Sequence, residues 1–177
     1  MVNKMSIEKI NEIHTKRLIL RKFRRDDLDN YYNILKQEQV NKWLGTGKRK
    51  SYDDVKNMIE RIENSWIEND YGVYAVINKE NNELIGHCGL NNIDNAKDVE
   101  LLYAFDPASW GNGYATESAK AVIEFAKTKT DLKKLIAIAY PDNRKSRNVI
   151  EKAGFQYKGI QEYFGANLSY YELDLYK

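Results

Sequence analysis

The spacing of apolar residues predicts a strand, two helices and a hairpin in the first half of the chain. Leucine at every second position of 18–21 is typical of a strand. Asp26 is the expected N-cap of the next helix, whose apolar residues recur three and four positions apart. Ser51 and Asp54 form the S-x-x-D pattern that opens a second helix. The hairpin is expected from two apolar runs around a polar turn, 72–77 and 84–90.

The second half of the chain alternates strands with helices. Gly154 is a natural residue to end the last helix, because glycine readily adopts the left-handed conformation found there. The predicted strands are 99–105, 135–140, 155–163 and 169–176, the last two joined by 164–168, and the predicted helices include 115–126 and 146–153.

A glycine-rich segment, Trp110-Gly111-Asn112-Gly113-Tyr114-Ala115-Thr116, lies between the strand 99–105 and the helix that follows. Glycines at 111 and 113 let the backbone turn so that successive N–H groups point at one spot. The first turn of the helix adds N–H donors without partners and the positive end of the helix dipole. This segment therefore predicts a binding site for a phosphate or a pyrophosphate.

Three kinds of phosphate-binding loop compete for this segment. A Walker loop needs Lys-Ser or Lys-Thr after the glycines, and neither is present. A dinucleotide fingerprint needs a third glycine where Thr116 stands, and an acidic residue after the next strand, whereas Asp131 precedes that strand. The third kind is the [Q/R]-x-x-G-x-[G/A] loop. Gly113 and Ala115 fit its last two positions, and Trp110 stands where Gln or Arg is usual.

The third loop belongs to the Gcn5-related N-acetyltransferases (GNAT), where it holds the pyrophosphate of coenzyme A. Residues 106–117 closely resemble its variant in the ribosomal-protein N-terminal acetyltransferase (RimJ/RimL-like) branch, where tryptophan before the glycine is common. On this loop alone, a glycine turn that merely joins a strand to a helix remains an alternative.

A second motif of the same family follows 30 residues after Gly113. The family pattern N-x-x-[AS]-x-x-x-x-x-K-x-G-F is matched by Asn143, Ser146, Lys152, Gly154 and Phe155. Two motifs in the family's order, separated by a strand, are more specific than either alone. Residues 15–21 also resemble the opening strand of the branch, so the resemblance covers nearly the whole chain.

The resemblance implies an α/β (α+β) GNAT fold. Its central sheet is mixed, mostly antiparallel, of about seven strands and splayed in the middle, with about four flanking helices. It also implies acetyl-CoA as co-substrate, with the pantetheine arm paired to the end of the strand before the glycine loop. The coenzyme-binding residues implied in this way are Ala104, Phe105, Trp110, Gly111, Asn112, Gly113, Tyr114, Ala115, Thr116, Asn143 and Ser146.

Glu100 and Ser146 are the candidate catalytic residues. Glu100 interrupts an apolar strand ten residues before Trp110, a place similar to that of the catalytic glutamate in several family members. Burial would raise its pKa towards the working pH of a general base. A water molecule as base, with Glu100 as an ordinary polar residue, is the alternative.

The usual acid of the family is a tyrosine seven residues after the asparagine, and Ile150 stands there. Ser146 lies one turn earlier on the same face and resembles the serine proposed as acid in the N-terminal acetyltransferase branch. Alternatively Ser146 is a small packing residue, and Asn143 a helix N-cap.

Length, charge and hydropathy limit the remaining classes of function. A length of 177 residues fits a single domain, 1–177, and 28 basic against 26 acidic residues leave a net charge of +2, unlike a nucleic-acid binder. No apolar run approaches the roughly 18 residues of a membrane span, and Met1–Ser6 lacks the apolar region of a secretory signal. We expect a cytoplasmic monomer or homodimer without nucleic-acid or membrane partners.

Two histidines and one cysteine give no cluster of metal ligands, so no metal is expected. His87 and Cys88 are neighbours on a predicted strand and point to opposite faces, which excludes a dyad between them. Cys88 is expected in the core.

The acceptor is expected to enter opposite the coenzyme, over the loop 43–50 and the hairpin 159–168. The loop is either a solvated turn or a lid. Its cations Lys48, Arg49 and Lys50 would repel a polyamine, which favours the N-terminal amine of a peptide or protein. A small amine, such as a polyamine or an aminoglycoside-type drug, is the alternative. A coenzyme A-binding sensor without turnover is an alternative of another class.

Overall fold

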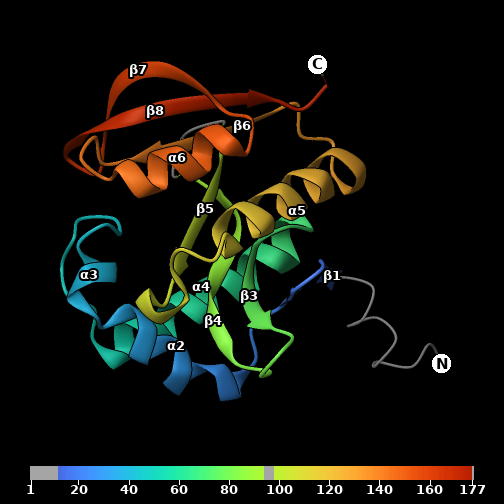
Figure 1. Ribbon diagram of the computed structural model, residues 1–177, viewed down its shortest axis with the longest axis vertical. Helices are drawn as coiled ribbons and strands as arrows, with labels where there is room; N and C mark the ends of the chain where they lie inside the picture. The colour runs from blue at the N-terminus through green and yellow to red at the C-terminus, as the bar shows by residue number, and fades with distance from the viewer. Residues whose placement is uncertain (1–11, 94–97, 177) are drawn as a thin grey trace.

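A computed structural model describes residues 12–93 and 98–176, and the expectation for Met1–Ser6 lies outside these ranges. One mixed sheet of eight strands, in the order β1-β2-β3-β4-β5-β6-β8-β7, forms the centre of the described chain (Figure 1). The strands are β1 (Ile13–His14), β2 (Leu18–Arg21), β3 (Val73–Asn78), β4 (Leu84–Asn92), β5 (Val99–Phe105), β6 (Lys134–Ala139), β7 (Gln156–Tyr163) and β8 (Ala166–Asp174).

Five helices flank the sheet in the described ranges: α2 (Leu28–Leu35), α3 (Glu38–Asn41), α4 (Tyr52–Asn69), α5 (Tyr114–Lys129) and α6 (Arg144–Lys152). Short 3-10 turns precede α2 (Arg25–Asp27) and α5 (Pro107–Ser109). The expected fold class is confirmed. The two-residue β1 and the four-residue α3 are short elements that apolar spacing did not predict.

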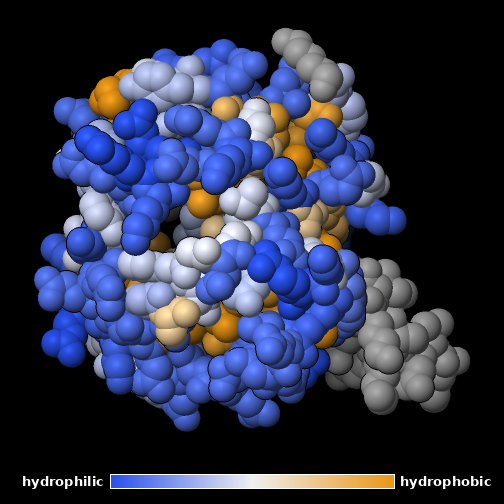
Figure 2. All heavy atoms as spheres, in the orientation of Figure 1, coloured by the Kyte–Doolittle hydropathy of each residue, from blue (hydrophilic) through white to orange (hydrophobic). Residues whose placement is uncertain are grey.

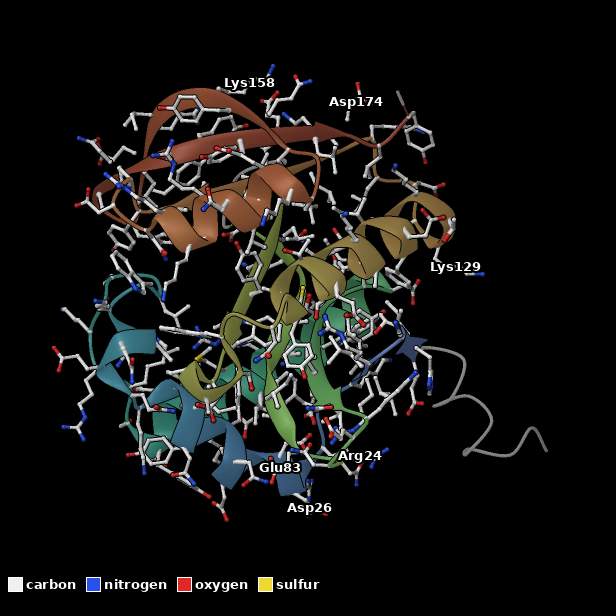
Figure 3. All side chains as sticks on the ribbon, viewed as in Figure 1. Arg24, Asp26, Glu83, Lys129, Lys158 and Asp174 are labelled. Atoms are coloured by element: carbon white, nitrogen blue, oxygen red, sulfur yellow. The ribbon has the colours of Figure 1, made fainter. Side chains whose placement is uncertain are left out.

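Alternation along β3 separates two apolar layers. Val73, Ala75 and Ile77 pack with the buried residues of α2 and α4 on one face of the sheet. Tyr74 and Val76 pack with those of α5 on the other face. Figure 3 labels Arg24, Asp26, Glu83, Lys129, Lys158 and Asp174, six charged side chains of both signs that all lie at the periphery. No helix of the described ranges combines the length and apolar character needed to cross a membrane.

The sheet splits between β5 and β6, as the resemblance implied. These two strands run parallel and share a single pair of register partners, Glu100 and Ile136. By contrast, β5 pairs with β4 along its whole length, from Val99 to Phe105. Beyond Glu100 the two halves of the sheet therefore diverge, and Figure 1 shows β6, β8 and β7 crossing above the steep β5. Among the strands that the structure describes, none pairs with this edge of β5 beyond Glu100.

The polar residues that we expected to begin two helices do so for α4 but not for α2. Ser51 and Asp54 form the predicted capping box of α4: the Asp54 N–H donates to Ser51 Oγ at 3.1 Å, and the Ser51 N–H to Asp54 Oδ2 at 2.8 Å. The prediction of Asp26 as an N-cap was wrong. A 3-10 turn moves the start of α2 by one residue, and Asp27 accepts the Arg24 N–H at 2.7 Å.

The turn between β7 and β8 is shorter than predicted. Phe164 and Gly165 form it alone, both with positive φ (54° and 74°), so β8 begins at Ala166. Two positive φ angles give the tight hairpin turn that asparagine and glycine usually mark. Phenylalanine carries no such signal, which is why the sequence pattern placed the strand three residues late.

Candidate active site

The glycine loop opens α5 through two left-handed residues. Gly111 and Gly113 both have φ of +79°, a conformation that residues with a Cβ rarely adopt, and Gly113 is the N-cap of α5. The N–H groups of the first helical turn have no partner within the helix. The loop and the helix end together offer N–H donors and a positive dipole to an anion.

A cavity of about 900 Å³ runs from this loop through the split in the sheet to the side of α2 and α4. Figure 2 shows the surface hollowed between α6 and the segment that leads into α5. Asn112, one of the residues singled out from the sequence, does not line the cavity, because its side-chain amide turns back to the Ser109 and Trp110 carbonyls at 3.0 and 3.3 Å. The others do line it: Glu100, Ala104, Phe105, Trp110, Gly111, Gly113, Tyr114, Ala115, Thr116, Asn143 and Ser146.

Glu100 is a buried carboxyl group on the cavity wall. It sits on β5 where the sheet splits, directly opposite Asn91 of β4, and is 8% exposed. Its side chain makes no hydrogen bond to any residue of the described ranges. Burial raises the pKa of Glu100 from 4.5 to about 8. A carboxyl group with this pKa exchanges protons in the range where many enzymes work.

Ser146 lies in the first turn of α6, beside the hydroxyl of Tyr103. The Ser146 Oγ is 2.9 Å from the Tyr103 hydroxyl oxygen, and the Tyr103 hydroxyl also lies 2.9 Å from the Ser146 carbonyl oxygen, to which it donates. Burial raises the pKa of Tyr103. Asn143 caps α6 through its side-chain oxygen, which accepts the Ser146 N–H at 3.2 Å. Ile150 is buried and brings no hydroxyl to the site.

Tyr31 and His87 form a polar pair on the other side of the sheet. The Tyr31 hydroxyl and His87 Nδ1 are 2.9 Å apart, and both residues line the cavity. Burial lowers the pKa of His87 to about 4, which keeps its imidazole neutral at pH 7. Cys88 points the opposite way, fully buried in the layer under α5, and burial raises the pKa of its thiol. The strand thus separates His87 from Cys88.

The segment 43–50 covers the cavity on this side. The Tyr140 hydroxyl, just after β6, donates to the Gly45 carbonyl at 2.8 Å, and the Tyr140 ring packs at 5.9 Å from the Trp43 ring. Trp43, Leu44, Gly45 and Lys50 line the cavity, as does Arg61 of α4. Lys48 and Arg49 are exposed and do not line it. Burial lowers the pKa of Lys50, although Asp54 acts in the opposite direction.

A comparison with models of protein families identifies the family of this chain. Residues 17–156 match the family model described as an acetyltransferase (GNAT) domain. The chain belongs to the GNAT acetyltransferase family. It is an acetyl-transferring enzyme.

A relative agrees with this assignment, and solved structures share the fold. The uncharacterized N-acetyltransferase p20 of Bacillus licheniformis is 28% identical over 149 residues, with 84% of each chain covered. A GNAT acetyltransferase structure from Bacillus anthracis superposes with a TM-score of 0.81 at 23% identity, covering 94% of this chain and 99% of that one. The ribosomal-protein alpha-N-acetyltransferase RimL, in complex with coenzyme A, has a TM-score of 0.79 at 19% identity and covers 93% and 98%.

Sequence reasoning missed several residues that line this cavity. Tyr103 read as one more apolar position of β5, and Tyr31 as part of the apolar side of α2. Arg61 carried no signal among the charged residues of α4. Within residues 12–93 and 98–176 no three His, Cys, Asp or Glu side chains are grouped to hold a metal ion.

Proposed function

We propose that this GNAT enzyme transfers the acetyl group of acetyl-CoA to the N-terminal amine of a peptide or protein. One observation carries the proposal: a single cavity connects the N-terminus of α5 with the buried Glu100 through the split between β5 and β6. Gly111, Gly113 and the first turn of α5 suit a diphosphate. The unpaired edge of β5 suits the amides of a pantetheine arm, and Asn143 lies across the same gap.

Two residues provide the proton transfers that the reaction needs, and a third positions one of them. Acetyl-CoA supplies an acetyl thioester, whose C–S bond breaks as a C–N bond to the acceptor forms. Glu100 takes the proton that the acceptor amine loses, directly or through a water molecule. The Ser146 hydroxyl gives a proton to the departing thiolate and regains one from solvent, while Tyr103, 2.9 Å away, positions it. Glu100 releases the amine proton to solvent, which closes the balance.

The acceptor side of the cavity supports a peptide amine over a polyamine. Lys50 and Arg61 place positive charge on its wall, which disfavours a polycation. The solved RimL, which shares the fold, is named a ribosomal-protein alpha-N-acetyltransferase. The Tyr140–Gly45 bridge supports a second candidate, a small amine, because it closes the cavity over the place where a longer chain would enter.

An assay of thiol release from acetyl-CoA separates these acceptors. The panel contains peptides that begin with Ala or Ser, the same peptides with a blocked N-terminus, spermidine and an aminoglycoside. Activity that needs a free peptide N-terminus supports the proposal, and activity with free small amines alone supports the second candidate. Binding of acetyl-CoA without release for any acceptor would indicate a sensor instead of an enzyme acting on these amines.

Removing the Ser146 hydroxyl tests the proposed acid. We expect Ser146→Ala to lower kcat by about 10²-fold, the lower end of general acid–base effects. Tyr103→Phe should cost about 2- to 10-fold, the worth of one hydrogen bond to the serine. Ser118→Ala is the control: this helix serine donates to the Tyr114 carbonyl at 2.8 Å and does not line the cavity. Equal kcat values for the three variants would contradict the role of Ser146.

A further inference from the structure

Arg17, the residue before β2, reaches across to the glycine loop. Its Nη1 donates to the Asn112 carbonyl at 2.8 Å, and its guanidinium carbon lies 4.5 Å from the centre of the Tyr114 ring. Its Nε and Nη2 both lie 2.7 Å from Glu117 Oε2 in the first turn of α5. The Arg17 side chain thus contacts three residues: Asn112, which precedes Gly113, Tyr114, the first residue of α5, and Glu117, the first acidic residue of α5.

The contact with Asn112 fixes the orientation of one peptide group. In a planar trans peptide the C=O and the following N–H point in opposite directions. Because Arg17 binds the Asn112 carbonyl, the N–H of Gly113 faces away from Arg17. Gly113 lines the cavity, and its φ of +79° would let this peptide rotate if nothing held it. The Arg17 bond therefore aims one N–H donor at the expected diphosphate position.

The Arg17 guanidinium also compensates the negative charge of Glu117. A carboxylate in the first turn of α5 would repel a diphosphate bound at that helix end. Here its oxygens are occupied: Thr15 Oγ1 donates at 2.6 Å and the Arg17 N–H at 3.0 Å, besides the guanidinium. Burial alone would raise the pKa of Glu117, but these bonds from Thr15 and Arg17 outweigh it and lower the pKa. Glu117 stays ionised, and Arg17 compensates its charge.

We propose that Arg17 is a positioning residue for the diphosphate of acetyl-CoA. It aims the Asn112–Gly113 peptide at the diphosphate and neutralises Glu117 beside it. This inference rests on the proposed function, since it needs acetyl-CoA at the loop.

Arg21, the last residue of β2, offers a control four residues along the chain. Its Nη1 and Nη2 donate to the two carboxylate oxygens of Asp27 at 2.7 and 2.8 Å, a pair as close as that between Arg17 and Glu117. It holds the turn before α2 and does not line the cavity. Arg21→Met therefore removes an ion pair of similar length and greater burial without touching the glycine loop.

The experiment compares two acetyl donors, acetyl-CoA and S-acetyl-pantetheine, which lacks the diphosphate. We expect Arg17→Met to raise the KM for acetyl-CoA by about 10-fold, as for one lost charge-assisted bond, with kcat little changed. Its kcat/KM for S-acetyl-pantetheine should equal that of the wild type. Arg21→Met should leave both donors unaffected. Glu117→Gln added to Arg17→Met should recover part of the affinity, because it removes the uncompensated charge.

Other outcomes overturn the proposal. These are an unchanged KM for acetyl-CoA in Arg17→Met, an equal loss with both donors, or no recovery with Glu117→Gln. If Arg17→Met does not fold, Arg17→Lys replaces it: lysine keeps the charge but cannot bond Asn112 and Glu117 together, so a KM like that of the wild type overturns the inference. A wild-type protein without affinity for acetyl-CoA would instead refute the proposed function.

Discussion

Glu100→Gln lowers kcat/KM at pH 7 by about 10²- to 10³-fold, because it removes the proposed base without changing the size of the side chain. The wild-type rate should rise with pH up to about 8, where Glu100 becomes ionised, and then level off. The variant should lose this dependence and follow only the ionisation of the acceptor amine. Its deficit therefore shrinks only above about pH 8, where the wild-type rate has levelled off and the amine is already free. Initial rates from pH 6 to 10 measure both curves.

The outcome that contradicts this role is a loss of equal size at every pH, which would point to a structural contribution. Asn91→Ala is the control, because Asn91 lies directly opposite Glu100 in the sheet and cannot act as a carboxylate base. It should keep the wild-type shape of the pH profile even if its rate falls.

Glu100→Gln also has a predictable effect on the free energy of unfolding. The pKa of Glu100 is raised from 4.5 to about 8 on folding, so the folded protein holds this proton more tightly than the unfolded chain. That contribution to stability is complete below about pH 4.5 and is lost as the pH rises to about 8. Glutamine cannot ionise. Thermal unfolding should therefore show the stability of Glu100→Gln rising relative to the wild type between about pH 4.5 and about pH 8, with no further change above that range.

Local signals in the sequence were enough for most of the framework. Ser51 with Asp54 marked the start of α4, and Gly154, with φ of +106°, follows the end of α6 as expected. The two left-handed glycines before α5 are also local, since only the backbone there demands them. Each of these features depends on residues a few positions apart, so it can be predicted from one sequence alone.

The polar pairs of the site depend on residues far apart in the chain. Tyr103 and Ser146 are separated by 43 positions, and Tyr31 and His87 by 56. Tyr103 and Tyr31 read as ordinary residues of their own strand or helix, and nothing in the sequence pairs them with Ser146 and His87. Only the packing of α6 on one face and α2 on the other brings the partners together. Tyr103 supplies a hydroxyl on the α6 side of the cavity, where Ile150 brings none, and no spacing rule could have found it.

Gly113→Val should weaken acetyl-CoA binding by about 10²-fold. Valine at φ of +79° carries backbone strain of about 1–3 kcal/mol, while its Cβ would make only an ordinary contact, 3.5 Å from Arg17 Nη2. The loop relieves this strain by turning the peptide that faces the diphosphate. Gly159→Val is the matched control, with φ of +114° and nothing within 4 Å of its Cβ, on β7 and outside the cavity lining. Calorimetric titration with acetyl-CoA should find its affinity unchanged, and equal affinities for Gly113→Val and wild type would refute the assignment of the loop.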